Sequence, residues 1–295
     1  MNQTADTTLF KPGHTACAGC GQAIGARLVI DAAGKNMIVC NNTGCLEVFS
    51  TKYPESSWAV PFIHSLFENC AAVASGVESA LKFLGKKDAI NVIAQAGDGG
   101  TADIGLQALS GMFERGHDIL YVCYDNEAYM NTGVQRSGLT PTDANTTTSP
   151  SGTASVGNPR PKKPMPEIAA AHGIPYVATA SVGYPQDVQK KVKKALAIRG
   201  PKYLQIHVPC PLGWGHEPGL TLEIARLAVE TGLYPVFEYD NGQLVSRKIA
   251  KIKPVEEYLK PQARFKHVLK NPGVLKQVQQ IADYHIQKYG LKAEA

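Results

Sequence analysis

The 295-residue sequence predicts an α/β fold with a doubly wound parallel sheet. The first observation behind this prediction is the order of segments, because short apolar runs alternate with stretches of helical spacing along most of the chain. The second is the run Gly97-Asp98-Gly99-Gly100, which joins an apolar run to a helical stretch that a further apolar run follows. This arrangement is typical of a βαβ unit, whose two strands end at the same edge of a parallel sheet.

The elements follow from apolar spacing, taken in order along the chain. The predicted strands cover residues 37–40, 89–96, 118–124, 176–180 and 203–208. The predicted helices cover residues 64–84, 104–113, 187–198 and 221–230. Asn241-Gly242 predicts a hairpin turn between 236–239 and 244–247.

Three segments stand apart from this alternation. A cysteine-rich loop lies near the N-terminus. A long polar loop covers residues 133–166, shortly after Asn126, and we expect it to serve as a lid or as a docking loop for a partner. We place a domain boundary at 235: residues 1–235 form the cofactor-binding domain, and 236–295 form a C-terminal extension that contacts partner subunits.

Asp98 and Asn126 are the candidate metal ligands. Each follows a strand of the βαβ unit, so both should lie side by side at the carboxyl edge of the sheet, where open α/β sheets bind ligands. Carboxylate and amide oxygens suit a hard divalent cation, and the glycines at 97, 99 and 100 let the backbone approach a phosphate. A tight turn with an Asp cap and no ligand is the alternative.

Gly-Asp-Gly followed by this asparagine resembles the signature of thiamine diphosphate enzymes. The resemblance implies a thiamine diphosphate-binding fold in which Mg²⁺ is held by Asp98, Asn126 and the main-chain carbonyl of Ala128. We count Gly97, Gly99, Gly100 and Gly21 with these residues as cofactor-binding.

Seven cysteines point to a second cofactor. Cys17 and Cys20 form a Cys-x-x-Cys pair, which can hold zinc, act as a redox dithiol or bind an iron–sulfur cluster. No strand precedes the pair, which disfavours a thioredoxin-like dithiol. Cys45 lies in a Gly-Cys loop and Cys210 between two prolines, so four exposed thiols are available for one [4Fe–4S] cluster. We interpret the remaining three as structural: Cys70 and Cys123 should be buried, and Cys40, at the end of a short apolar run, is the runner-up ligand.

The chain resembles the β subunits of 2-oxoacid:ferredoxin oxidoreductases, and among them those of the multi-subunit pyruvate synthases. The resemblance runs from about residue 10 to about residue 270. The segments that carry it are 12–14 with 17–21, 42–45, 61–64 with 67–69, 97–99, 131–135, 147–150, 209–211 and 262–267.

That resemblance implies reversible, CoA-dependent oxidative decarboxylation of pyruvate, with electrons passing through the cluster to ferredoxin. An α subunit would supply the pyrimidine half-site and the activating glutamate, alongside γ and ferredoxin-like δ subunits, so this chain alone should be inactive. Asn131, Thr132 and Gln135 would face the thiazolium and the 2-oxoacid. His64 and Glu68, four residues apart on the predicted helix, either handle protons there or have a structural role.

Composition excludes some function classes. The net charge of +5 is mild and spread among acids, so we expect no nucleic-acid binding, and no apolar run reaches the roughly 20 residues that a membrane span needs. The polar start has no signal-peptide core, and we expect a cytoplasmic location. Three alternatives stay open: a 2-oxoisovalerate oxidoreductase, a thiamine enzyme without a redox centre, and a zinc-stabilised assembly module.

Overall fold

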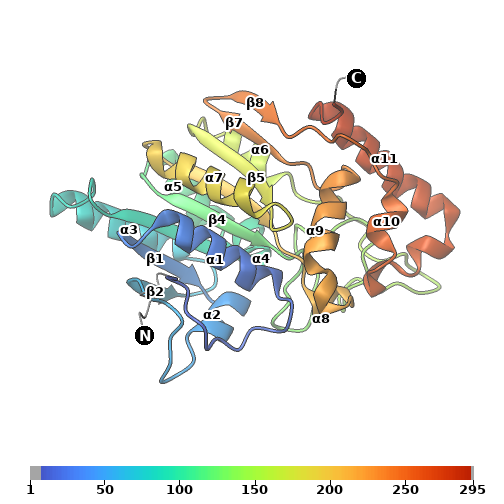
Figure 1. The fold of residues 1–295 in the computed structure, drawn as a ribbon, viewed down its shortest axis with the longest axis horizontal. Helices are drawn as coiled ribbons and strands as arrows, with labels where there is room; N and C mark the ends of the chain where they lie inside the picture. The colour runs from blue at the N-terminus through green and yellow to red at the C-terminus, as the bar shows by residue number, and fades with distance from the viewer. Residues whose placement is uncertain (1–7, 294–295) are drawn as a thin grey trace, which may run out of the picture.

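The computed structural model describes residues 8–293 and confirms the doubly wound sheet (Figure 1). In this part of the chain eight strands form one sheet, in the order β2-β1-β3-β4-β6-β5-β7-β8. The first six strands in this order pair in parallel, and the hairpin β7–β8 is antiparallel. The strands are β1 (Met37–Asn42), β2 (Phe62–Ser65), β3 (Asn91–Gly97), β4 (Leu120–Asp125), β5 (Tyr176–Ser181), β6 (Lys202–His207), β7 (Phe237–Asp240) and β8 (Gln243–Ser246).

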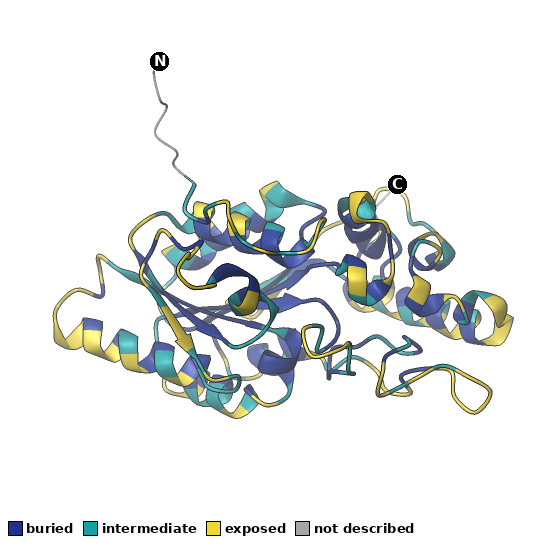
Figure 2. Ribbon diagram, turned by 90° about the horizontal axis from the view of Figure 1, so that it is seen from below, coloured by how far each residue is buried: buried dark blue, intermediate teal, exposed yellow. Residues whose placement is uncertain are grey.

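Helices cover both faces of the sheet. The α-helices are α1 (Gly21–Ala33), α2 (Cys45–Ser50), α3 (Cys70–Phe83), α4 (Asp98–Ala102), α5 (Leu106–Glu114), α6 (Met165–Ala170), α7 (Pro185–Ala197), α8 (Pro211–Trp214), α9 (Thr221–Glu230), α10 (Val255–Leu259) and α11 (Pro272–Lys288). Apolar residues of α1 and α7 pack on one face, and those of α3, α5 and α6 pack on the other. Figure 2 shows the central strands as a buried layer between these helices. Burial on both faces explains why these strands read as continuous apolar runs.

One predicted helix begins in the wrong place. The apolar stretch from 64 was expected to be helical throughout, but residues 62–65 form the short strand β2 and the helix begins only at Cys70. His64 and Glu68 therefore do not share a helix face. Four residues are too few for the period-2 alternation of a strand to show in the sequence.

The segment after residue 235 packs onto the rest of the chain. β7 pairs with β5, and both Asn241 and Gly242 adopt positive φ angles of 48° and 80°, as the predicted hairpin turn requires. Val274, Val278 and Ala282 of α11 enter a buried cluster with α9 and α10. The boundary at 235 and contacts of this segment with other subunits stay predictions; residues 1–7 and 294–295 lie outside the described residues.

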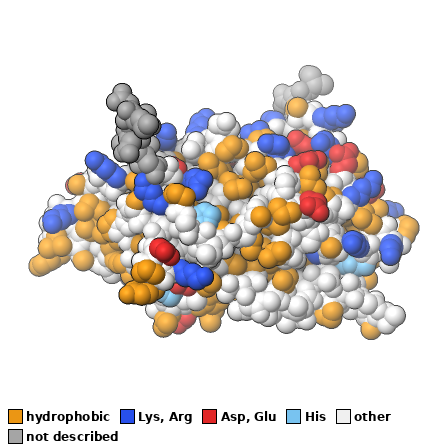
Figure 3. All heavy atoms as spheres, turned by 60° about the horizontal axis from the view of Figure 1, so that its bottom comes forward, with side chains coloured by type: hydrophobic (Ala, Val, Ile, Leu, Met, Phe, Trp, Pro, Cys, Tyr) orange, Lys and Arg blue, Asp and Glu red, His pale blue; other side chains and the backbone are white. Residues whose placement is uncertain are grey.

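The surface is mixed in character. On the face shown in Figure 3, apolar side chains spread across the middle and the basic side chains are scattered rather than gathered. Within residues 8–293, no helix has both the length and the apolar character that a membrane span requires.

Candidate functional site

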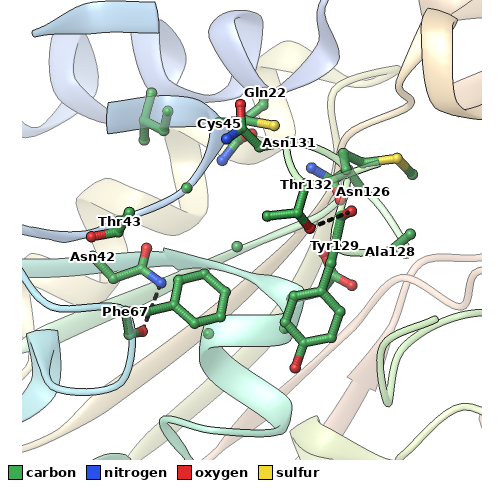
Figure 4. Close-up of a pocket in the computed structure, with 17 residues that line it drawn as sticks. Gln22, Asn42, Thr43, Cys45, Phe67, Asn126, Ala128, Tyr129, Asn131 and Thr132 are labelled. Carbon is green, nitrogen blue, oxygen red and sulfur yellow. Dashed lines mark hydrogen bonds between the residues drawn. The ribbon is translucent and has the colours of Figure 1, made fainter. Parts of the chain in front are cut away.

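A cavity of about 250 Å³ opens at the carboxyl edge of the sheet, where β1, β3 and β4 end (Figure 4). We call it the Asp98 cavity. Its lining comes from five parts of the chain, which are the start of α1, the loop from β1 to α2, the loop from β2 to α3, the turn from β3 to α4, and the loop after β4. The residues are Gln22, Asn42–Leu46, Phe67, Gly97–Gly100, Asn126 and Ala128–Thr132.

Asp98 and Asn126 meet in this cavity, as predicted from the βαβ unit. Asp98 is 1% exposed, and the Ser137 hydroxyl donates a hydrogen bond to its carboxylate. Burial, together with the nearby Asp125 carboxylate, raises the pKa of Asp98. A cation in the cavity would therefore favour the ionised form of Asp98.

Three oxygens converge beside Asp98. The side-chain amide of Asn126 lies 2.9 Å from a carboxylate oxygen of Asp98 and 2.8 Å from the main-chain carbonyl oxygen of Ala128, and it donates a hydrogen bond to both when its NH₂ faces them. Rotation of the amide would turn its oxygen towards the same point. Carboxylate, amide and carbonyl oxygens are the ligands that a hard cation prefers, so these residues fit Mg²⁺.

The glycines of the turn differ in what surrounds them. A Cβ on Gly99 would lie 2.3 Å from the Tyr129 ring, and a Cβ on Gly100 would lie 2.0 Å from the Asn42 amide. A Cβ on Gly97 would have no heavy atom within 4 Å in the described part of the chain, apart from its two chain neighbours, and Gly97 borders the open cavity. Gly99 and Gly100 thus permit close packing, while Gly97 leaves room for a ligand.

The loop after β4 presents Asn131 and Thr132 to the cavity. Gln135 lies one step back: it accepts a hydrogen bond from the Thr132 hydroxyl at 2.5 Å and donates one to the Thr132 carbonyl at 2.8 Å. Gln135 therefore holds Thr132 in place, and its side chain does not line the cavity.

The four predicted cysteine ligands line a second cavity, of about 160 Å³. We call it the thiol cavity. Cys17 and Cys20 reach it from the N-terminal loop, Cys45 from the start of α2, and Cys210 from the segment after β6. The other cysteines, Cys40, Cys70 and Cys123, are buried in the core on the α3 side of the sheet.

The thiols influence one another electrostatically. Burial, reinforced by neighbouring cysteines, raises the pKa of Cys20 to about 11 and that of Cys45 to about 12. Four thiolates in this cavity would therefore need a cationic centre to hold them. Among residues 8–293, no group of three or more His, Cys, Asp or Glu is arranged around a single-ion position. Thiolates around a cube of four irons stand further apart than thiolates around one ion, so the four thiols remain compatible with a cluster.

The two cavities share one wall. Gln22, Cys45, Asn126 and Asn131 line both of them. Figure 4 shows Gln22, Cys45 and Asn131 close together at one end of the Asp98 cavity. A reactant at Asp98 and a metal centre at the thiols would be separated only by these side chains.

Comparison with known proteins agrees with this geometry. The family description "Thiamine pyrophosphate enzyme, C-terminal TPP binding domain" matches residues 42–206. The chain is 58% identical to pyruvate synthase subunit PorB of Methanosarcina barkeri, over 99% of this chain and 100% of the relative. It is 50% identical to ketoisovalerate oxidoreductase subunit VorB of Pyrococcus abyssi, over 88% and 86% of the two chains.

The chain belongs to the 2-oxoacid:ferredoxin oxidoreductase β-subunit family. It carries a thiamine diphosphate-binding domain, and its enzyme class works as a multi-subunit complex. A solved 2-oxoglutarate:ferredoxin oxidoreductase from Magnetococcus marinus has the same fold, with a TM-score of 0.58 and 22% identity over 76% of this chain and 82% of that one. The resemblance drawn from the sequence motifs is thereby confirmed.

His64 and Gly21 of this β subunit also lie outside the Asp98 cavity. His64 is 44% exposed at its side chain, and its Nε2 lies 2.8 Å from the Thr43 hydroxyl. Gly21 packs against the chain, since a Cβ there would lie 2.6 Å from the Pro209 carbonyl oxygen. Its small size therefore lets α1 approach the segment that carries Cys210.

Sequence reasoning missed a buried charge cluster behind the metal loop of this β subunit. Glu127, with φ of 70°, pairs with Lys162 at 2.7 Å and with Arg264 at 2.6 Å. Burial opposes ionisation of Glu127, but the charges of Lys162 and Arg264 outweigh it and lower the pKa of Glu127 to about 2. The cluster ties the long loop and the C-terminal segment to the residues between Asn126 and Ala128. The only signal in the sequence was the Gln262–His267 segment shared with the family.

Proposed function

We propose that this chain is the catalytic β subunit of a pyruvate:ferredoxin oxidoreductase. Pyruvate, CoA and two oxidised ferredoxins give acetyl-CoA, CO₂, two reduced ferredoxins and one proton, reversibly. The observation that carries the proposal is the wall shared by the Asp98 and thiol cavities. It would put an electron acceptor directly beside the centre where the carboxylate is lost.

Thiamine diphosphate would occupy the Asp98 cavity. Asp98, Asn126 and the Ala128 carbonyl would hold Mg²⁺ against the diphosphate, for which the open side of Gly97 leaves room. The bound cofactor supplies the electron sink that decarboxylation of a 2-oxoacid requires. Asn131 and Thr132 would orient the 2-oxoacid through uncharged hydrogen bonds, and Gln135 would fix the Thr132 hydroxyl.

Cys17, Cys20, Cys45 and Cys210 would hold one [4Fe–4S] cluster in the thiol cavity. The cluster supplies a one-electron acceptor next to the reacting centre. Burial raises the pKa of Cys20 and of Cys45, so these thiols would become thiolates only with a cation such as iron beside them. A zinc site in an assembly module uses the same thiols, and metal analysis separates the two.

Pyruvate is the substrate that similarity favours. The Methanosarcina barkeri relative named for pyruvate synthase is 58% identical, against 50% for the Pyrococcus abyssi relative named for ketoisovalerate oxidoreductase. A second carboxylate, as in 2-oxoglutarate, would need a cation. Arg136 is the one cation of residues 126–150, and its Nε donates to the Asn158 side chain at 2.9 Å instead of lining the cavity.

The remaining parts of the site would come from other chains in the cytoplasm. An α subunit would supply the pyrimidine half-site and the activating glutamate, γ and ferredoxin-like δ subunits would complete the complex, and ferredoxin would accept the electrons. His64, exposed at the rim beside Thr43, would act in proton handling only once such a partner covers it.

The test is acyl-CoA formation by the anaerobic complex with pyruvate, 2-oxoisovalerate and 2-oxoglutarate at equal concentrations. We expect the highest kcat/KM with pyruvate, and iron and thiamine in the purified complex. A preference for 2-oxoisovalerate would assign the branched-chain reaction and overturn pyruvate. Thiamine without iron would assign a non-redox thiamine enzyme, and zinc without either would assign the assembly module.

A further inference from the structure

Gln22 is the residue of the shared wall that has no assigned task. It lines both the Asp98 cavity and the thiol cavity, yet it is only 4% exposed. In Figure 4 its side chain lies beside Cys45 and Asn131. Cys45 and Asn126 of this wall are candidate ligands, and Asn131 faces the candidate substrate position.

The backbone at the start of α1, from which the Gln22 side chain extends, is held in place by Gly21. The Gly21 N–H donates to the Pro209 carbonyl at 3.1 Å, and no side chain fits between these two residues. Because Pro209 precedes Cys210, the position of Gln22 is tied to one side of the thiol cavity. Its place in the wall is therefore a property of the backbone and not of a flexible rotamer alone.

The amide of Gln22 is incompletely satisfied. Its Oε1 is buried and has no hydrogen-bond partner among the described residues. Leaving a buried acceptor unpaired lowers the stability of the fold, so native structures rarely keep one without a reason. A polar group in this state, placed between two cavities, indicates that their occupants complete its hydrogen bonds.

The chemistry of the two expected occupants decides which end of the Gln22 amide faces each cavity. Thiolates and inorganic sulfides offer only acceptors, so the thiol cavity suits the NH₂ end. The Asp98 cavity would hold thiamine diphosphate, whose pyrimidine amino group is its N–H donor, and it suits the carbonyl end. One amide therefore fits between the two occupants in one orientation.

We propose that Gln22 is a bridging residue between the two cofactors: its NH₂ donates to a cluster sulfur, and its Oε1 accepts from an N–H in the Asp98 cavity. The inference rests on the proposed function, since it needs both occupants. An N–H···S bond stabilises the extra negative charge of the reduced cluster and so raises its reduction potential. Gln22 thus makes the cluster a better acceptor from the thiamine side.

The test uses the anaerobic holo-complex with Gln22→Met and Gln22→Glu. Methionine keeps the length of the side chain and removes both polar ends; glutamate keeps an acceptor and replaces the donor by negative charge. Gln107→Met, on the exposed side of α5 and outside both cavities, is the matched control. The measurements are the midpoint potential of the cluster by EPR titration, iron content, and the Kd of thiamine diphosphate.

We expect full iron content and a midpoint potential that falls in the order wild type, Gln22→Met, Gln22→Glu, with no shift for Gln107→Met. The Kd of thiamine diphosphate should rise about two- to tenfold in Gln22→Met, which is the effect of one hydrogen bond. Should the Met variant not assemble, the polar and near-isosteric Glu variant still gives the potential.

Equal midpoint potentials in wild type and both Gln22 variants, with iron retained, would overturn this inference and leave the proposed function intact. Absence of iron in the wild-type complex would instead overturn the proposed function. The iron content of the wild-type complex therefore distinguishes a failure of this inference from a failure of the proposed function.

Discussion

The indole N–H of Trp214 donates a hydrogen bond to the main-chain carbonyl of Asn126 at a distance of 2.8 Å. Trp214 is the last residue of α8, and its main-chain N–H donates a hydrogen bond to the carbonyl of Cys210, which precedes the first residue of that helix. A single helical turn thus joins a candidate cluster ligand to a candidate magnesium ligand. The Arg264 guanidinium stacks 3.7 Å from the centre of the indole ring and pairs with Glu127, so the link is held from both sides.

Replacing Trp214 by phenylalanine should weaken binding of Mg²⁺ and thiamine diphosphate. The ring beneath Arg264 is kept, but the hydrogen bond that positions the Asn126 backbone is lost, at a cost of about 1–1.5 kcal/mol. We expect the Kd of thiamine diphosphate to rise about tenfold. Isothermal titration, with iron content measured in parallel, checks this. An unchanged Kd would show that the indole only fills space.

Replacing Cys210 by alanine should remove the cluster, whereas Cys40→Ala should keep it. Cys210 lines the thiol cavity, while Cys40 is fully buried in β1 and packs in the core on the α3 side of the sheet. Iron and acid-labile sulfide, together with the anaerobic visible spectrum, check this in both variants. Loss of iron in Cys40→Ala and full iron in Cys210→Ala would place the fourth ligand at Cys40.

The sequence anticipated the parts of this site that depend on one βαβ unit. β3 and β4 pair in parallel, with Gly97 opposite Tyr124, so Asp98 and Asn126 follow neighbouring strand ends. Periodicity sufficed because both strands are buried and the turn between β3 and α4 is short. The helix 221–230 was also predicted with the bounds that α9 has.

The parts that the sequence did not anticipate depend on contacts between distant segments. Arg264 and Glu127 are 137 positions apart, and no local pattern relates two such residues. Nothing in the sequence marked Gln22 as a site residue, for a different reason. Glutamine is common on helix surfaces, and only the fold shows that Gln22 is buried between two cavities. Its place directly after Cys20-Gly21 was the one available clue.

Gly97→Ala and Gly99→Ala should fail in different ways. A methyl group at Gly97 meets no neighbour but borders the cavity, so the protein should keep its stability and lose affinity for thiamine diphosphate. At Gly99 the methyl group would overlap the Tyr129 ring, and overpacking of this kind costs about 1–3 kcal/mol. Urea unfolding and cofactor titration on both variants check the contrast. Equal stability of the two variants would contradict it.

His207→Phe should make the chain more resistant to mild acid. His207 is fully buried, and neither ring nitrogen has a hydrogen-bond partner among residues 8–293. Its ring packs 4.5 Å from that of Tyr234, measured between centroids. Burial lowers the pKa of His207 to about 3, although the Glu127 carboxylate works in the opposite direction.

The direction of the pH effect follows from this shift. In the unfolded chain the imidazole has a pKa of about 6.5 and binds a proton, whereas in the folded chain it stays neutral. The stability of the wild type therefore falls as the pH drops from about 6.5 towards 3. Phenylalanine removes this proton uptake and keeps the ring contacts. We expect similar stability of the two proteins at pH 7, and a gain of about 2 kcal/mol for the variant relative to wild type at pH 5. Urea unfolding of the cluster-free chain at both pH values measures it, and parallel pH dependence in the two proteins would show that His207 is protonated in the folded state.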